Sequence, residues 1–114
     1  MTVRRITPYL AAEDFDAVRE FYAGFVGLTE GDFGGDHVGF GAGPAQVVAT
    51  RAGAALRPDL GIDVGTPDEV DRLHAAALER GLEIVYGPVE EPWGVRRFFV
   101  RDPTGAVVSI LAHA

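Results

Sequence analysis

The stretch Glu91–Leu111, EPWGVRRFFVRDPTGAVVSIL, decides the fold of this chain. Its centre, Asp102-Pro103-Thr104-Gly105, has the composition of a type I turn, because Asp can bond to its own backbone, Pro presets φ at the second position and Gly closes the turn. Apolar residues that favour strands lie on both sides of the turn. The stretch therefore predicts a β-hairpin that follows an aromatic loop, Glu91-Pro92-Trp93-Gly94, although such a turn would suit any antiparallel sheet.

The composition is that of one soluble globular domain, with 114 residues, 47% hydrophobic and 24% charged residues and a net charge of −7. Cysteine is absent, which excludes disulfides, thiolate metal sites and a cysteine nucleophile. The sequence shows no basic face suited to nucleic acid and no apolar run of about 20 residues that could span a membrane. The N-terminus is predicted to be a strand and not a signal peptide, so we expect a cytoplasmic protein. The acidity indicates either solubility alone or a preference for a cationic partner.

The first half of the chain is predicted to hold a strand, a helix and three short strands. The strand covers residues 3–11, and Pro8 indicates that it lies at an edge, starts late or carries a bulge, because proline cannot donate a ladder hydrogen bond. Asp14 can cap a helix that runs to about Val26, and Gly27 ends it. Three short strands follow between residues 28 and 49, separated by glycines. The apolar stripe of the helix consists of Phe15, Val18, Tyr22 and Phe25.

The second half repeats this order. A strand over 60–64 precedes a helix that Thr66 caps, with Glu69 completing a capping box, and that Gly81 ends. A strand over 82–87 and the hairpin finish the chain. Superposing the two helices aligns residues 16–22 with 68–74. The sequence therefore predicts an α+β fold, with a single domain 1–114 made of two βαβββ modules, about 1–51 and 57–114. The modules would form a curved mixed sheet with the helices outside and a concave cavity within, where a small ligand could bind.

The doubled β-α-β-β-β order resembles the vicinal-oxygen-chelate superfamily of glyoxalases, extradiol dioxygenases and bleomycin-resistance proteins. The resemblance covers essentially the whole chain. Its most specific motifs are Pro92-Trp93-Gly94 and Arg101-Asp102-Pro103 followed by Gly105, which look most like the bleomycin-resistance branch. The family commonly has Asn after the turn glycine, whereas this chain has Ala106.

The metal enzymes of that superfamily hold a divalent ion with four His or Glu side chains, one from each of four strands. The resemblance assigns the corresponding positions here to Thr7, Asp59, Ser109 and the strand around 47–49. No Asp, Glu or His occurs between Val38 and Pro58. One carboxylate with two hydroxyls is a weak donor set for a divalent ion. We therefore expect a member of the superfamily without its metal, with no metal ligands and no cofactor.

The concave side of the sheet is the expected ligand site. If the first strand keeps its register, Thr7 and Tyr9 face this side, and the alternate residues Ile6, Pro8 and Leu10 pack beneath the helix. Asp59 and Asp63 would share the concave side on the first strand of the second module, and Ser109 would line it from the last strand.

Aromatic side chains are expected to stack on the rings of the ligand. Trp93 is the first of these, with His37 or Phe33 opposite. The alternatives are that Trp93 packs against its own domain and that His37 is an ordinary loop histidine.

We predict from these features a metal-independent small-molecule-binding protein that sequesters a cationic aromatic antibiotic of the glycopeptide type, with no catalytic residues assigned. The alternative is a metal-dependent or acid/base lyase, isomerase or glyoxalase-like enzyme, in which Asp59, Asp63 or Tyr9 would transfer protons. A third interpretation is a regulator that binds another small ligand. In each case we expect a homodimer, because exposed strand edges favour a partner. Pro8 would then be the hinge of a strand exchange, as in resembling resistance proteins, or an ordinary edge-strand proline.

Overall fold

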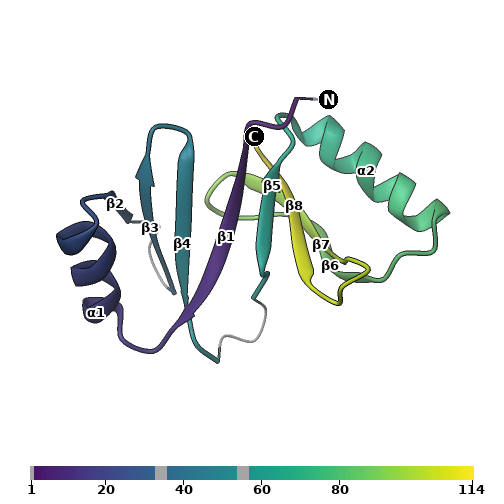
Figure 1. Cartoon of the computed structure of the whole chain (residues 1–114). Helices are drawn as coiled ribbons and strands as arrows, with labels where there is room; N and C mark the ends of the chain where they lie inside the picture. Colours follow the sequence, from purple (N-terminus) through teal and green to yellow (C-terminus); the bar gives the residue numbers. More distant parts are fainter. Residues whose placement is uncertain (1, 33–35, 54–56) are drawn as a thin grey trace. The chain divides into compact units, whose positions relative to one another are not determined.

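The structure is a computed structural model that describes residues 2–32, 36–53 and 57–114. The chain forms two compact units, Thr7–Arg57 and Pro58–Ala114, and the N-terminal residues up to Ile6 join the second unit. Each unit contains a strand, a helix and three further strands in that order (Figure 1). The predicted α+β class and the doubled β-α-β-β-β order are confirmed.

In the first unit, four strands pair in the order β2-β3-β4-β1. β1 is parallel to β4, whereas β3 is antiparallel to both of its neighbours, β2 and β4. The elements are β1 (Arg5–Ala12), α1 (Phe15–Arg19), the π-helix η1 (Glu20–Phe25), β2 (Thr29–Asp32), β3 (His37–Ala42) and β4 (Ala45–Arg51). The core beneath the helix contains Ala12, Val38, Phe40 and Ala49.

The helix of the first unit differs from the prediction after its first turn. Asp14 caps it as predicted, since its Oδ1 accepts a hydrogen bond from the Ala17 N–H at 3.0 Å. From Glu20 onward the helix widens to π geometry, and the Val26 N–H donates to the Phe21 carbonyl at 2.9 Å. This extra residue in the turn rotates Phe25 away from the apolar stripe, so its side chain is 78% exposed and its predicted burial was wrong.

The first strand also differs from the prediction. Its alternate residues were expected to pack beneath the helix, but Ile6 and Leu10 are 56% and 38% exposed and Pro8 is also exposed. Ala12 lies on the same face of β1 and packs in the core with the helix residues, so the helix covers only the end of this strand. The homodimer and the strand exchange at Pro8 stay predictions.

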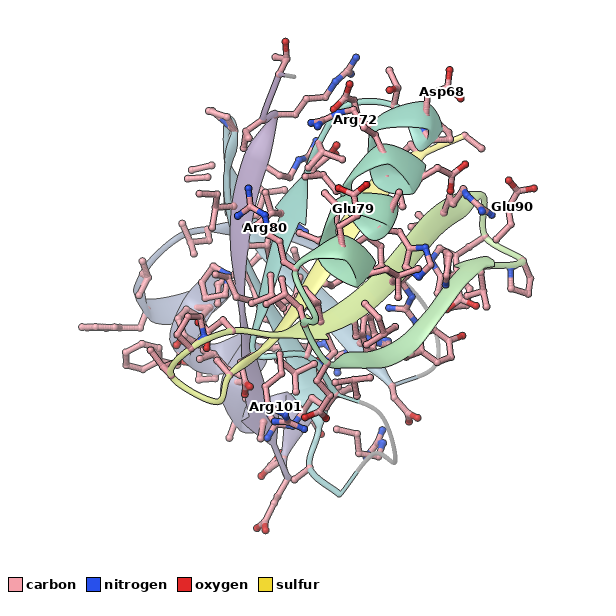
Figure 2. The ribbon with its side chains drawn as sticks, turned by 90° about the vertical axis from the view of Figure 1, so that its right-hand side faces the viewer. Asp68, Arg72, Glu79, Arg80, Glu90 and Arg101 are labelled. Carbon is pink, nitrogen blue, oxygen red and sulfur yellow. The ribbon has the colours of Figure 1, made fainter. Side chains whose placement is uncertain are left out.

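In the second unit, four strands pair in the order β5-β8-β7-β6, with β5 parallel to β8 and the other pairs antiparallel. The elements are β5 (Leu60–Asp63), α2 (Pro67–Glu79), β6 (Ile84–Glu90), β7 (Val95–Arg101) and β8 (Val107–His113). α2 covers one face of this sheet, and Val64, Val70, Ala77, Phe98 and Ala112 form the core between them. The outward side of α2 carries charged side chains, among them Asp68, Arg72, Glu79 and Arg80 (Figure 2).

The ends of α2 follow the sequence signals. Thr66 Oγ1 accepts a hydrogen bond from the Glu69 N–H at 3.2 Å, which caps the first turn. At the other end Gly81 has φ +68, the Leu82 N–H donates to Ala77 at 3.0 Å and the Gly81 N–H donates to the Leu78 carbonyl at 3.1 Å. This pair of bonds is a Schellman motif, which a glycine at this position favours.

The predicted hairpin is confirmed as β7 and β8. The Gly105 N–H donates to the Asp102 carbonyl at 3.0 Å, and Asp102 Oδ1 accepts hydrogen bonds from the Thr104 hydroxyl at 2.6 Å and from the N–H groups of Thr104 and Ala106. The Thr104 hydroxyl and these backbone donors hold the pKa of Asp102 below its ordinary value. The Asp side chain therefore organises the turn, as its position in the sequence predicts.

The N-terminal residues attach to the second unit at β5, since the Arg4 N–H donates a hydrogen bond to the Asp63 carbonyl at 2.8 Å. Among the residues that the structure describes, no helix is long and apolar enough to cross a lipid bilayer.

Candidate functional site

The sheet of the second unit has one face that points away from α2. Phe98, Val100 and Ile110 pack with α2, so the residues that alternate with them, among them Arg97, Phe99 and Ser109, lie on the opposite face. We call this surface the distal face. It carries Asp63, Tyr86, Arg97, Phe99 and Ser109, together with Glu91 and Trp93 from the loop between β6 and β7.

Arg97 is the centre of the distal face. Its Nε donates to Glu91 Oε2 at 2.7 Å and its Nη2 contacts the same oxygen, while the Tyr86 hydroxyl donates to Glu91 at 3.1 Å. The side chains of Arg97 and Glu91 are only 18% and 10% exposed. The guanidinium carbon lies 4.8 Å from the ring centroid of Phe99, 5.3 Å from that of Trp93 and 5.6 Å from that of Tyr86. We call these five residues the Arg97 box.

Backbone geometry explains why these residues meet. Arg97 and Phe99 are two positions apart in β7, so they share a face, and Tyr86 is the β6 partner of Phe99. The loop before β7 is closed by two hydrogen bonds, from the Glu91 N–H to the Val95 carbonyl at 2.7 Å and from the Gly94 N–H to the Glu91 carbonyl at 3.0 Å. Gly94 has φ +85, a conformation that suits glycine and turns the chain back into β7.

The Tyr86 hydroxyl is held in its protonated form. Burial raises the pKa of Tyr86, and the hydrogen bond to Glu91 raises it further, against a smaller lowering by the charge of Arg97. The hydroxyl therefore donates to Glu91, and the Glu91 carboxylate accepts hydrogen bonds from both Tyr86 and Arg97.

Trp93 is the exposed member of the box. Its side chain is 61% exposed although Arg97 lies beside the ring. A large apolar side chain that is held in a closed loop and still faces solvent is a preformed surface for a flat ligand. Sequence reasoning singled out Trp93 but missed Tyr86, Glu91 and Arg97. Alternation in the stretch Arg97-Phe98-Phe99 could have shown that Arg97 shares a face with an aromatic ring.

Asp63 and Ser109 supply two buried polar atoms to the distal face. Asp63 is 1% exposed and Ser109 is fully buried. Asp63 Oδ1 accepts from the Gly65 N–H at 2.9 Å, but Asp63 Oδ2 and Ser109 Oγ have no hydrogen-bond partner within the described ranges. His113 Nε2 lies 4.0 Å from Asp63 Oδ2. Buried polar atoms are almost always hydrogen-bonded, so these two oxygens are candidate contacts for a polar ligand group or an ordered water.

The positions that the resemblance assigns to metal ligands do not fit a divalent ion. Thr7 and Ser109 offer hydroxyls, and Val47, Val48 and Ala49 offer no donor side chain. Asp59 Oδ2 accepts a hydrogen bond from the Val107 N–H at 2.9 Å, a contact that helps to join the start of β5 to β8. In residues 2–32, 36–53 and 57–114, no three His, Cys, Asp or Glu side chains are grouped as a metal site would require.

The other predicted site residues belong to the first unit. Thr7 is buried and Tyr9 is half-buried in β1, and His37 begins β3, where it pairs with Thr50 of β4. Phe33 lies outside the described residues. The structure therefore groups Asp63, Ser109 and Trp93 on one face of the second unit, whereas Thr7, Tyr9 and His37 lie in the first unit.

A shallow hollow of about 300 Å³ also lies over the strands β2, β3 and β4. Four glycines contribute to its lining, Gly31, Gly39, Gly41 and Gly43. Its one carboxylate, that of Glu30, is paired with Arg19 at 3.0 Å. None of the predicted site residues lines this hollow.

Solved structures share the fold at low sequence identity. A glyoxalase/bleomycin resistance protein/dioxygenase superfamily member from Vibrio splendidus 12B01 has a TM-score of 0.69 at 16% identity, with 99% of this chain and 100% of that chain covered. The Mn(II)-bound glyoxalase from Novosphingobium aromaticivorans has a TM-score of 0.69 at 22% identity, with 96% of this chain but 38% of that chain covered. A protein from Legionella pneumophila described as an NAD-dependent benzaldehyde dehydrogenase has a TM-score of 0.74 at 16% identity, with 96% and 99% covered. Identities this low show the fold alone.

No curated protein sequence matches this chain. The family model of the Glyoxalase/Bleomycin resistance protein/Dioxygenase superfamily matches residues 3–110, which is almost the whole sequence. The chain belongs to the glyoxalase/bleomycin resistance protein/dioxygenase superfamily.

Proposed function

We propose that this protein is a metal-independent binding protein for a small aromatic ligand, and that the distal face of the second unit is its site. The observation that carries the proposal is the exposed indole of Trp93, which a closed loop and the guanidinium of Arg97 hold in place. An aromatic ring stacked on it would contribute about 0.5–1.5 kcal/mol beyond the area that it buries. Because the indole is already positioned, little side-chain entropy is lost on binding.

The ligand class that we propose is a cationic aromatic antibiotic of the glycopeptide type, which the protein would sequester. Three features support this class: the net charge of −7, the buried Oδ2 of Asp63, for which the described residues supply no hydrogen bond, and the membership of bleomycin-resistance proteins in the same superfamily. A cation that reached Asp63 would be attracted strongly, because the surroundings of this oxygen screen charge poorly. No residue is assigned a catalytic role.

Titration with cationic glycopeptide antibiotics is expected to quench the fluorescence of Trp93, the single tryptophan of the chain. Replacing Trp93 with alanine should weaken binding about tenfold, through the loss of stacking on the indole, as measured by calorimetry. The matched control is Phe25→Ala, which removes a 78% exposed aromatic ring of the first unit and should leave the affinity unchanged. An absence of quenching at micromolar antibiotic would exclude this ligand class.

Protein purified without chelators is expected to contain no stoichiometric divalent metal, because Asp59 is the one carboxylate at the positions of the family's ligands and the others carry hydroxyls or apolar side chains. Elemental analysis by mass spectrometry measures this directly. One bound Mn, Fe, Ni or Zn ion per chain would overturn metal independence and favour an enzyme of the superfamily.

A further inference from the structure

We propose that the Arg97 box is a subsite that selects by charge, accepting a neutral aromatic group with a hydrogen-bond acceptor and rejecting aromatic groups that carry an ammonium or a carboxylate. The inference rests on the proposed function and specifies which part of the ligand lies against Trp93. The cationic part of the ligand must then bind outside the box.

The box rejects a cation because it already contains one. Three aromatic rings around a carboxylate make a surface that attracts cations, but the guanidinium of Arg97 occupies it, 4.8–5.6 Å from the three ring centroids. The Arg97 side chain is 18% exposed, so water screens its charge poorly. The Glu91 carboxylate that could attract a second cation is already engaged by Arg97, so a cation on Trp93 would lose hydration without gaining an opposite charge.

The box rejects a carboxylate because Glu91 already neutralises Arg97. Both Nε and Nη2 of Arg97 contact the same oxygen of Glu91, whose side chain is 10% exposed. The pair is neutral in sum, so a second carboxylate would find no net positive charge and would lie close to that of Glu91.

A neutral acceptor fits the remaining geometry. The contacts with Glu91 use Nε and Nη2, and Nη1 takes no part in them. A guanidinium has five N–H donors in one plane, so Nη1 can donate to a carbonyl oxygen or a ring nitrogen. Arg97 covers one face of the indole, so a flat group stacks on the other face, and its acceptor must extend past the edge of the ring to reach Nη1.

Three probes with one ring system separate these possibilities: methyl naphthyl ketone, naphthoate and naphthylmethylammonium. Binding to the wild-type protein at neutral pH is followed by the nitrogen–proton NMR signals of Arg97 Nε–H and Trp93 Nε1–H. We expect the ketone to shift both signals and to bind about tenfold more tightly than either charged probe, because a charged probe loses hydration beside an ion pair that is already neutral in sum.

Replacing Arg97 with methionine should reverse this order. The variant keeps Glu91 and the three rings but removes the resident cation, so the ammonium probe should become the preferred ligand by about tenfold. Combining Arg97→Met with Glu91→Gln should abolish the preference for the ammonium probe. The matched control is Arg96→Met, which removes the same charge from the preceding residue of β7. Arg96 pairs with Asp71 of α2 at 2.7 Å. This control should keep the wild-type order.

The order of the wild-type affinities decides the inference even if a variant does not fold. A charged probe that binds the wild-type protein as tightly as the ketone, or a ketone that leaves the Arg97 and Trp93 signals unmoved, overturns the subsite. If glycopeptide antibiotics still quench Trp93 in that case, the proposed function stands and only the charge selection is lost. If they do not, both are lost.

Discussion

Replacing Phe98 with alanine is expected to lower the free energy of unfolding by about 3–5 kcal/mol. Phe98 is 1% exposed and lies in the core between α2 and its sheet, against Val64, Val70 and Ala77. The ring of His74 meets it edge-on, with the centroids 5.3 Å apart. Removing the phenyl group forfeits its burial and leaves a cavity that this packed region cannot fully close. Urea unfolding of the wild type and the variant measures the difference.

Phe25→Ala is the matched control, because it makes the same chemical change at a side chain that is 78% exposed. Its effect should stay within about 0.5 kcal/mol. The chain has two compact units, so unfolding should be followed both by circular dichroism and by the fluorescence of Trp93, which reports on the second unit. Equal losses for Phe98→Ala and Phe25→Ala would contradict the description of the core.

The elements that the sequence predicts correctly are those whose determinants are neighbours in the chain. The turn at Asp102 needs only the next four residues, and their hydrogen bonds are formed as expected. The cap at Thr66 and the Schellman motif at Gly81 are equally local. In each case the side chain that predicts the element also makes the bond that stabilises it.

The features that the sequence did not predict depend on geometry beyond those neighbours. The exposure of Phe25 follows from a change to π hydrogen bonding, which no residue in Glu20–Phe25 signals. The Arg97 box depends on how β6 pairs with β7, and that register shifts twice, between Ile84 and Tyr86 and between Tyr86 and Val89. Alternation alone therefore could not bring Tyr86 opposite Phe99. The burial of Asp63 Oδ2 without a hydrogen bond from the described residues depends in the same way on tertiary packing.

Arg97 and Glu91 should be strongly coupled, so the losses in the free energy of unfolding caused by their single variants should not add. Arg97→Met leaves the Glu91 carboxylate with little exposure to water and without its counterion, so we expect a loss of about 3 kcal/mol in the free energy of unfolding. The double variant with Glu91→Gln should lose less than Arg97→Met alone, because the uncompensated charge is gone and the Tyr86 hydroxyl keeps an acceptor. Urea unfolding at neutral pH is measured for the wild type, both single variants and the double variant. The four free energies of unfolding give the coupling free energy of Arg97 and Glu91.

The same cycle on Arg72 and Glu69 of α2 is the control, since these side chains are 2.8 Å apart but 56% and 27% exposed. Water and salt screen such a pair, so its coupling should be too small to resolve. Strictly additive losses for Arg97 and Glu91 would show that the pair is solvated in solution. A solvated pair could neither hold Trp93 in place nor exclude charged rings from it, because both properties require a guanidinium that is fixed and poorly screened. The stability cycle therefore tests, without any ligand, the physical condition on which the charge selection of the distal face depends.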